Sequence, residues 1–175
     1  MRRKDRALSR EEAYEVIDAV SYAVLAFSGE AYAVPISFVR EGDTLYMHGA
    51  KIGTKMTRIE EDSRATMVFV DEPHVPDLYT DAELEEAIAE DSMRVFSRVF
   101  TTDFRSAIAS GTIEVVRDDE ECVHAMELLC ERYLPEKAKF ARAAYASSKT
   151  RTAVLKFTMK EITAKGKTTV KLPVE

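Results

Sequence analysis

Two runs of alternating apolar and polar residues, joined by a short turn, constrain the fold more than any other feature. The first run covers residues 31–39, the second covers residues 44–48, and a Glu-Gly-Asp sequence separates them. A period of two is typical of a strand with one buried face, and a short turn between two such runs predicts a β-hairpin. Because strands joined by a tight turn run antiparallel, the sequence predicts an antiparallel sheet.

Further helices and strands are predicted around this hairpin from their periodicity. Ser9 and Glu12 form a capping-box pattern at the start of a helix over residues 9–20. Other helices are predicted at 52–59, 119–133 and 136–145, and strands at 22–27, 65–70, 106–116 and 151–159, with Gly111 as a bulge and a short strand within 162–172 left open. The strands come in neighbouring runs without regular crossover helices. This order predicts a mainly β protein with α-helices, in which an antiparallel sheet closes into a small barrel with the helices at its periphery.

The chain is predicted to form a single domain over residues 1–175, because its 175 residues fall within the usual length of one domain. Residues 71–104 interrupt the barrel pattern, and an acidic amphipathic helix is predicted within them at 81–90. We interpret this segment as an excursion from the barrel. Since it is longer than a plain connection, a lid over a pocket is one role that it leaves open.

Composition excludes several classes of function. The formal net charge of −6 argues against nucleic acid as a partner, because neutralising phosphates requires a basic face. No apolar run approaches the roughly 20 residues that span a bilayer, and no apolar segment of a signal peptide follows the basic residues at 2–6. We therefore expect a soluble, cytoplasmic protein. Cys122 and Cys130 would lie about 12 Å apart along one helix, too far for a disulfide, so buried free thiols are expected.

Residues 45–56, where an apolar strand opens into small residues and lysines, form a candidate phosphate site. Gly49 and Gly53 allow a ligand to approach the backbone closely, and the helix that follows presents free N–H groups at its start. Lys51 and Lys55 add two cations at this point. The alternative is an exposed turn with solvated lysines, and these residues alone do not decide between the two.

Pro35 lies within an otherwise regular strand. A proline removes a ladder hydrogen bond, so it marks a strand edge, a bulge or a place where a ligand faces the backbone. Ser37 adds a hydroxyl group beside it. The hairpin is expected to set residues 34–37 alongside residues 46–48. The pocket would then combine a phosphate-binding end with an apolar platform, which suits a flat aromatic cofactor with a phosphate tail.

The segment from Tyr32 to Glu72 resembles the flavin-binding split-barrel proteins, and is most similar to the pyridoxamine-5′-phosphate-oxidase-related, nitroimidazole-resistance-like branch. The shared motifs are V-P-x-x-F at 34–38, Y-x-H-G-A at 46–50 and G-x-K at 53–55, followed by a helix and a strand rich in Val and Phe. The basic opening at residues 2–6 and the late strand at 152–155 fit the same branch. The resemblance implies an antiparallel split β-barrel, the FMN-binding split barrel, over most of the chain, with residues 71–104 outside it.

The resemblance also implies a cofactor, FMN, and the residues that bind it. They are Lys51, Thr54 and Lys55 for the phosphate, Val34, Pro35, Ile36 and Ser37 around the ring, and Tyr46, Met47, His48, Gly49 and Ala50 beneath the cofactor. Members of this family are generally homodimers with the flavin at the subunit interface. Ser106, with Phe104 and Arg105, is therefore expected to complete the pocket from the other subunit.

The implied activity is that of an FMN-dependent oxidoreductase, in which NAD(P)H reduces the flavin and the flavin reduces a small acceptor. In the nitroimidazole-resistance-like branch this acceptor is thought to be a nitroaromatic drug. His48 would face the flavin as a general acid, with a structural, hydrogen-bonding histidine as the alternative. The sequence also allows a non-catalytic flavin carrier, a deazaflavin protein, a haem protein with His48 or His74 as axial ligand, and an interaction protein with a vestigial pocket.

The chain departs from the pattern of true pyridoxamine-phosphate oxidases. Those enzymes carry a C-terminal W…R-L-x-P signature, whereas this sequence contains no tryptophan. Vitamin B6 oxidation is therefore not expected. A metal site is not expected either, because the histidines do not lie at metal-ligand spacing with one another or with cysteine.

Overall fold

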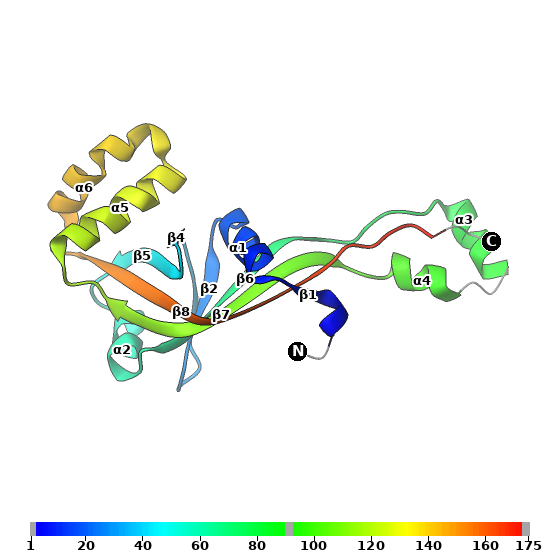
Figure 1. Ribbon diagram of the computed structural model, residues 1–175, viewed down its shortest axis with the longest axis horizontal. Helices are drawn as coiled ribbons and strands as arrows, with labels where there is room; N and C mark the ends of the chain where they lie inside the picture. Colours follow the sequence, from blue (N-terminus) through cyan, green and yellow to red (C-terminus); the bar gives the residue numbers. More distant parts are fainter. Residues whose placement is uncertain (1–2, 90–92, 173–175) are drawn as a thin grey trace.

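The computed structural model describes residues 3–89 and 93–172, whose strands form one eight-stranded sheet with helices around it (Figure 1). The elements are η1 (Lys4–Arg6), β1 (Ala7–Leu8), α1 (Arg10–Ala19), β2 (Ala23–Phe27), β3 (Ala33–Ile36), β4 (Val39–Glu41), β5 (Thr44–Ala50), α2 (Thr54–Glu61), β6 (Arg64–His74), α3 (Asp81–Ala89), α4 (Met93–Val99), β7 (Asp103–Val115), α5 (Asp119–Tyr133), η2 (Pro135–Phe140), α6 (Ala141–Ser148) and β8 (Thr152–Lys167). The helices predicted at 9–20 and 119–133 are confirmed, and Ser9 and Glu12 form both hydrogen bonds of the capping box.

The sheet curls into a half-barrel, and its two edge strands, β3 and β4, follow each other directly in the chain. Its strands are ordered β3-β2-β6-β7-β8-β5-β4, with antiparallel neighbours and with β1 on β8. β3 and β4 stand at opposite ends of this order, although only Ser37 and Phe38 separate them in the chain. The chain thus passes from one end of the sheet to the other at these two residues. This is the antiparallel split barrel that the family resemblance implied.

The prediction of a single strand over residues 31–39 is wrong, because the chain bends before β4. β3 pairs with β2, and only β4 pairs with β5. The β4–β5 ladder extends no further than Val39 opposite Tyr46. Residues 34–37 therefore do not lie alongside residues 46–48 in a hairpin.

Two local features explain the bend. Pro35 has no N–H to donate, so it suits β3 as an edge strand. At the bend, the Phe38 N–H donates to the Tyr133 hydroxyl (3.1 Å), whose own hydrogen is within reach of the carbonyl oxygens of Phe38 (2.8 Å) and Ser21 (2.5 Å). A side chain from α5 thus supplies the hydrogen bonds that a neighbouring strand would otherwise provide.

The barrel interior is filled by the inward-facing residues of the strands. Fully buried side chains there include Leu25, Phe38, Leu45, Met47, Met67, Phe69, Ile113, Leu155 and Phe157. Val16 and Ile17 of α1 join the same cluster. Because each such side chain contributes about 1.5–3 kcal/mol when fully buried, this core dominates the stability of the barrel.

A bulge at Gly111 lets β7 and β8 remain paired over a long distance. Ser110 lies opposite Glu161 and Gly111 opposite Met159, so the register shifts here as predicted. β8 then continues to Lys167. Strand structure within 162–172, which the sequence left open, is thus present at 162–167, as a continuation of β8 past the bulge.

Residues 71–104 lead away from the barrel along the extended ends of β6 and β7, and α3 and α4 lie at the far end (Figure 1). Tyr79, Ala87 and Val95 form a small core there, and the C-terminal segment is attached by the Leu172 N–H, which donates to the Tyr79 hydroxyl (2.7 Å). α3 confirms the predicted acidic helix, whereas α4 was not predicted. Figure 1 shows α3 and α4 at the opposite end of the molecule from α2, α5 and α6, so within one chain the excursion does not lie over those helices.

α5, η2 and α6 form a second cluster against the outer face of β4 and β5. The predicted helix at 136–145 is only partly correct: a 3-10 turn begins at Pro135, and the α-helix follows as α6. Cys122 and Cys130 are free thiols, the first of them buried. Within the described ranges no helix combines the length and the hydropathy needed to cross a membrane.

Candidate functional site

The Lys55 ammonium group lies directly over Gly49, where β5 ends and α2 begins. A Cβ atom at residue 49 would lie 2.3 Å from Lys55 Nζ, so only glycine leaves room for the ammonium group in this position. Lys55 is partly buried, and its ammonium group forms no ion pair or hydrogen bond with any residue that the structure describes. Burial without a partner lowers the pKa of Lys55.

The start of α2 adds further unsatisfied donors beside this lysine. Gly53 precedes the helix with a φ of 109°, a conformation that favours glycine, and no side chain caps the helix there. The N–H groups of the first turn consequently have no side-chain acceptor. Thr54 is the first helical residue, and Lys51 is exposed before the turn. This end of β5 therefore has an excess of donors and positive charge.

His48 lies next to this positive charge on the opposite face of β5. Burial of the ring is the main cause that lowers its pKa, and the charge of Lys55 lowers it further, although the residue as a whole is exposed. This direction favours the neutral form of the His48 ring. An anion bound beside Lys55 would raise the pKa of both groups.

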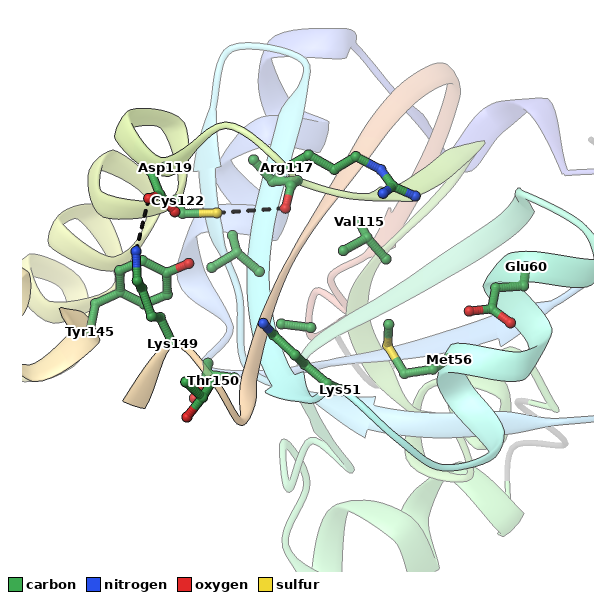
Figure 2. A pocket seen from close by; sticks show the side chains of 14 residues that line it. Lys51, Met56, Glu60, Val115, Arg117, Asp119, Cys122, Tyr145, Lys149 and Thr150 are labelled. Carbon is green, nitrogen blue, oxygen red and sulfur yellow. Dashed lines mark hydrogen bonds and ion pairs between the residues drawn. The ribbon is translucent and has the colours of Figure 1, made fainter. Parts of the chain in front are cut away.

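A cleft of about 590 Å³ adjoins this end of β5, between α2, α6 and the ends of β7 and β8. Figure 2 shows Lys51 pointing into it, with Met56 on one side and Tyr145 on the other. Val154, which lies opposite His48 in the β5–β8 ladder, also lines it. The cleft thus offers an apolar floor with a cation at its edge.

The structure brings together one part of the predicted site and separates another. His48, Gly49, Ala50, Lys51, Thr54 and Lys55 lie around the junction of β5 and α2. The side chains of Ile36 and Met47 point into the barrel core, so only their backbone could contact a ligand. The Tyr46 side chain is buried under α5, where its hydroxyl donates to Glu121 (2.9 Å).

The β3 residues lie apart from this junction along the sheet. Pro35 and Ser37 are exposed and Val34 is partly buried, and β3 pairs with β2 rather than β5. Ser106 is on β7, nine residues from Val115 in the cleft wall, which is about 30 Å along a strand. Ser106 can therefore join this site only from a second copy of the chain.

The sequence analysis did not identify the second wall of the cleft. Arg117, Cys122, Tyr145 and Lys149 line it from the end of β7, α5 and α6. The Lys149 ammonium group is paired with Asp119 (2.9 Å), and the Cys122 thiol donates to the Val116 carbonyl oxygen (3.6 Å). These residues are distant in sequence from the predicted motif, and no local pattern indicates that α6 returns to α2.

The described residues contain no group of three or more His, Cys, Asp or Glu side chains that could hold a metal ion. His74 lies at the end of β6, and His124 on α5 is near the Glu41 carboxylate (3.0 Å). The three histidines are thus on separate elements.

Comparison with known families decides the classification. The family model described as pyridoxamine 5′-phosphate oxidase matches residues 9–83 and 77–166, which together make up most of the chain. The chain belongs to this family. No curated protein sequence matches it.

Three solved structures of other members of this fold are similar over nearly the whole chain. The flavocytochrome of Azotobacter vinelandii matches with a TM-score of 0.76 and 19% identity, over 99% of this chain and 74% of that chain. The FAD and heme binding protein of Mycobacterium smegmatis matches with a TM-score of 0.69 and 23% identity, over 90% of this chain and 71% of that chain. A protein of Bacteroides thetaiotaomicron described as a candidate 5-nitroimidazole antibiotic resistance protein matches with a TM-score of 0.66 and 19% identity, over 91% of this chain and 86% of that chain. At these identities the similarity establishes the pyridoxamine-oxidase-like fold.

Proposed function

We propose that this pyridoxamine 5′-phosphate oxidase family member is a flavoprotein that binds FMN, with the phosphate at the junction of β5 and α2. The observation that carries the proposal is the partly buried Lys55 ammonium group, seated over Gly49 without an anionic partner among the described residues. A cation in such a place is costly unless it is paired. A phosphate, with about −1.5 to −2 charges at pH 7, would supply the missing partner.

The neighbouring groups fit the same anion. The N–H groups at the start of α2 and the Thr54 hydroxyl are donors, and Lys51 adds a second cation. The isoalloxazine ring would extend from this point toward the cleft, where Met56 and Val154 provide apolar contact. These residues would bind and orient the cofactor, and two fold neighbours, described as a flavocytochrome and as an FAD and heme binding protein, support a flavin.

The redox chemistry comes from the flavin when it is bound. The proposed reaction takes electrons from NAD(P)H and passes them to a small acceptor, for which a nitroaromatic compound is the candidate suggested by the Bacteroides neighbour. Burial and the charge of Lys55 lower the pKa of His48 in the free protein, and the phosphate would raise it. The histidine could then hold a proton close to the ring and deliver it to a reduced product.

A homodimer is the second part of the proposal. A row of outward-facing residues crosses five strands in register and comprises Pro35, Val24, Val68, Ile108 and Thr163. Val24 is 39% and Ile108 42% exposed, which is unusual for aliphatic residues in the middle of a sheet. A second copy seated on this row would bury it and could bring Ser106 to the partner's cofactor.

The absorption spectrum of the freshly purified protein tests the proposed function. Flavin bands are expected, and heat-released cofactor should co-elute with FMN in chromatography. FAD in place of FMN would correct the cofactor, a Soret band would show haem, and a shifted flavin-like spectrum would show a deazaflavin. A colourless protein that also fails to bind added FMN would overturn the proposal. Oxidation of NADPH with a nitroaromatic acceptor then separates an enzyme from a carrier.

Replacing Gly49 with Ala is expected to weaken FMN binding about 10-fold with little change in melting temperature. The new Cβ would displace the flexible end of Lys55 rather than backbone, so the fold should tolerate it. Gly166→Ala is the matched control, because a Cβ there meets its nearest neighbour, Leu8, at an ordinary 3.4 Å. Fluorescence titration with FMN measures the effect, and equal affinities of the two variants would contradict the assigned role of Gly49.

Replacing Ile108 with Glu is expected to convert the dimer into a monomer, because the charge would be buried at the centre of the apolar row. Light scattering coupled to size-exclusion chromatography measures the mass. Val170→Glu is the control, since Val170 is 66% exposed on the C-terminal segment. A wild-type monomer, or a dimer that persists in Ile108→Glu, would place the interface elsewhere.

A further inference from the structure

Four cations from three separate segments line a second cleft, of about 470 Å³, at the other end of the sheet. They are Arg3 and Arg6 of the N-terminal segment, Arg98 of α4 and Lys167 at the end of β8. Among the described residues that line this cleft, Asp5 is the only carboxylate. Such a concentration of positive charge is unexpected in a chain whose net charge is −6.

Strand pairing explains why these cations meet. β1 follows η1 directly and pairs with β8, with Ala7 opposite Lys165, so Arg6 is held near the end of β8. The Lys167 ammonium group donates to the Thr101 hydroxyl, which lies just after α4. The three segments are therefore fixed to one another by backbone and side-chain hydrogen bonds. The backbone positions that carry these cations are thus held together at this end of the sheet.

Most of this positive charge is not neutralised. Arg3 is paired with Asp5 (2.6 Å), but Arg6, Arg98 and Lys167 form no ion pair within the described ranges. The nearby buried Asp103 carboxylate accepts hydrogen bonds from the Thr169 N–H (2.8 Å) and hydroxyl (2.5 Å). The pKa of Lys167 is lowered, mainly by burial; Asp103 opposes this shift, and the three arginines add to it.

We propose that this cleft binds a phosphoryl anion, either free or as part of a small molecule. The excess of two or three positive charges matches the charge of one or two phosphate groups, since each carries about −1.5 to −2 at pH 7. Guanidinium groups bind phosphate oxygens in pairs of parallel hydrogen bonds, and the hydroxyls of Thr101 and Thr168 add neutral partners. A nucleic acid fits less well, because the acidic remainder of the chain would repel a long polyanion.

Within one chain, the site is separate from the proposed flavin site. Lys167 lies fifteen residues from Thr152, which lines the first cleft, or roughly 50 Å along a strand. Within one chain, a substitution at one cleft should not alter ligand binding at the other cleft. The proposal concerns a different part of the same chain, and the experiment below tests it separately from the proposed flavin function.

Isothermal titration of the full-length protein with sodium pyrophosphate and with orthophosphate, each in buffer free of other phosphate, tests the proposal. Saturable binding is expected, and Arg98→Glu should weaken it at least 10-fold. Arg94→Glu is the matched control: it makes the same charge change on the same helix, but Arg94 is exposed outside the cleft and should alter affinity less than 2-fold. Stronger binding of pyrophosphate than of orthophosphate would indicate a diphosphate-bearing ligand, and the reverse order a single phosphate.

Three results would overturn the proposal: no saturable binding to the wild type, equal losses in the two variants, or a loss of flavin in Arg98→Glu with unchanged pyrophosphate binding. The last would assign these cations to a partner's flavin. Circular dichroism melting checks that the variants are folded. Should Arg98→Glu fail to fold, amide shifts of wild-type Gly166 and Thr168 on adding pyrophosphate locate the site directly, and their absence would equally refute it.

Discussion

Replacing Lys51 and Lys55 together with Ala should reduce FMN affinity by at least 100-fold while leaving riboflavin affinity unchanged. The two lysines are the cations nearest the proposed phosphate position, and a hydrogen bond to a charged group contributes about 1.5–3 kcal/mol. Two such contacts account for about 3 kcal/mol, which corresponds to roughly 100-fold in affinity. Quenching of flavin fluorescence during titration measures both ligands, and riboflavin isolates the phosphate because it differs from FMN only there.

The double replacement of Lys137 and Lys139 with Ala is the control for charge. Both residues are exposed on η2 and outside the cleft, and the change in net charge is the same. It should alter FMN affinity by less than 2-fold. If the Lys51 and Lys55 variant bound FMN like the wild type, the phosphate would be held elsewhere. If FMN and riboflavin weakened equally, the lysines would act on the fold or the ring rather than on the phosphate.

Replacing Gly111 with Ala should destabilise the protein by about 1–3 kcal/mol, the usual cost of overfilling a packed site. A Cβ there would lie 2.0 Å from the Thr158 carbonyl oxygen and 3.1 Å from the Phe157 ring, so strand backbone would have to move. For a chain of this length the melting temperature should fall by roughly 2–4 °C per kcal/mol. Thermal unfolding followed by circular dichroism measures this.

Gly166→Ala is again the matched control, because it adds the same methyl group to the neighbouring strand without a close contact. Its melting temperature should lie within about 1–2 °C of the wild type, as for substitutions away from packed features. Equal melting temperatures for the two variants would contradict this prediction. They would show that β7 and β8 can move apart at the bulge, so that the bulge does not require a glycine at residue 111.

The elements that the sequence predicted well are those whose signals are local. The helix at 119–133 begins where the Asp118 carboxylate accepts a hydrogen bond from the Glu121 N–H (2.8 Å), and it ends just before Pro135. The Gly111 bulge was likewise predicted from one residue type within one strand. In each case the backbone preference and its cause lie within a few residues of each other.

The clustering of the candidate phosphate-site residues was predictable for the same reason. Gly49, Lys51 and Lys55 lie within seven consecutive residues, so a strand followed by a helix is enough to bring them together. The position of Ile36 and Met47 was not predictable in the same way. Their alternation is correct, but which face of each strand becomes the inside of the barrel depends on how the whole sheet curls.

Strand pairing also explains why the prediction for residues 31–39 was wrong. The alternation indicates one continuous strand, whereas the chain bends where the Tyr133 hydroxyl bonds to the Phe38 backbone. Tyr133 is 95 residues from Phe38 in the chain. A contact of this kind leaves no periodic signal near the bend.

By itself, the sequence determined the type of most elements, the antiparallel character of the sheet and the cluster of glycines and lysines between β5 and α2, because each depends on neighbouring residues. Only the tertiary structure decided the partners of β3, the second wall of the cleft and the meeting of Arg6, Arg98 and Lys167. These depend on long-range strand pairing, in which residues brought together by the sheet are far apart in the chain. The local conformational preferences of the residues do not encode pairing between segments that lie so far apart in the chain.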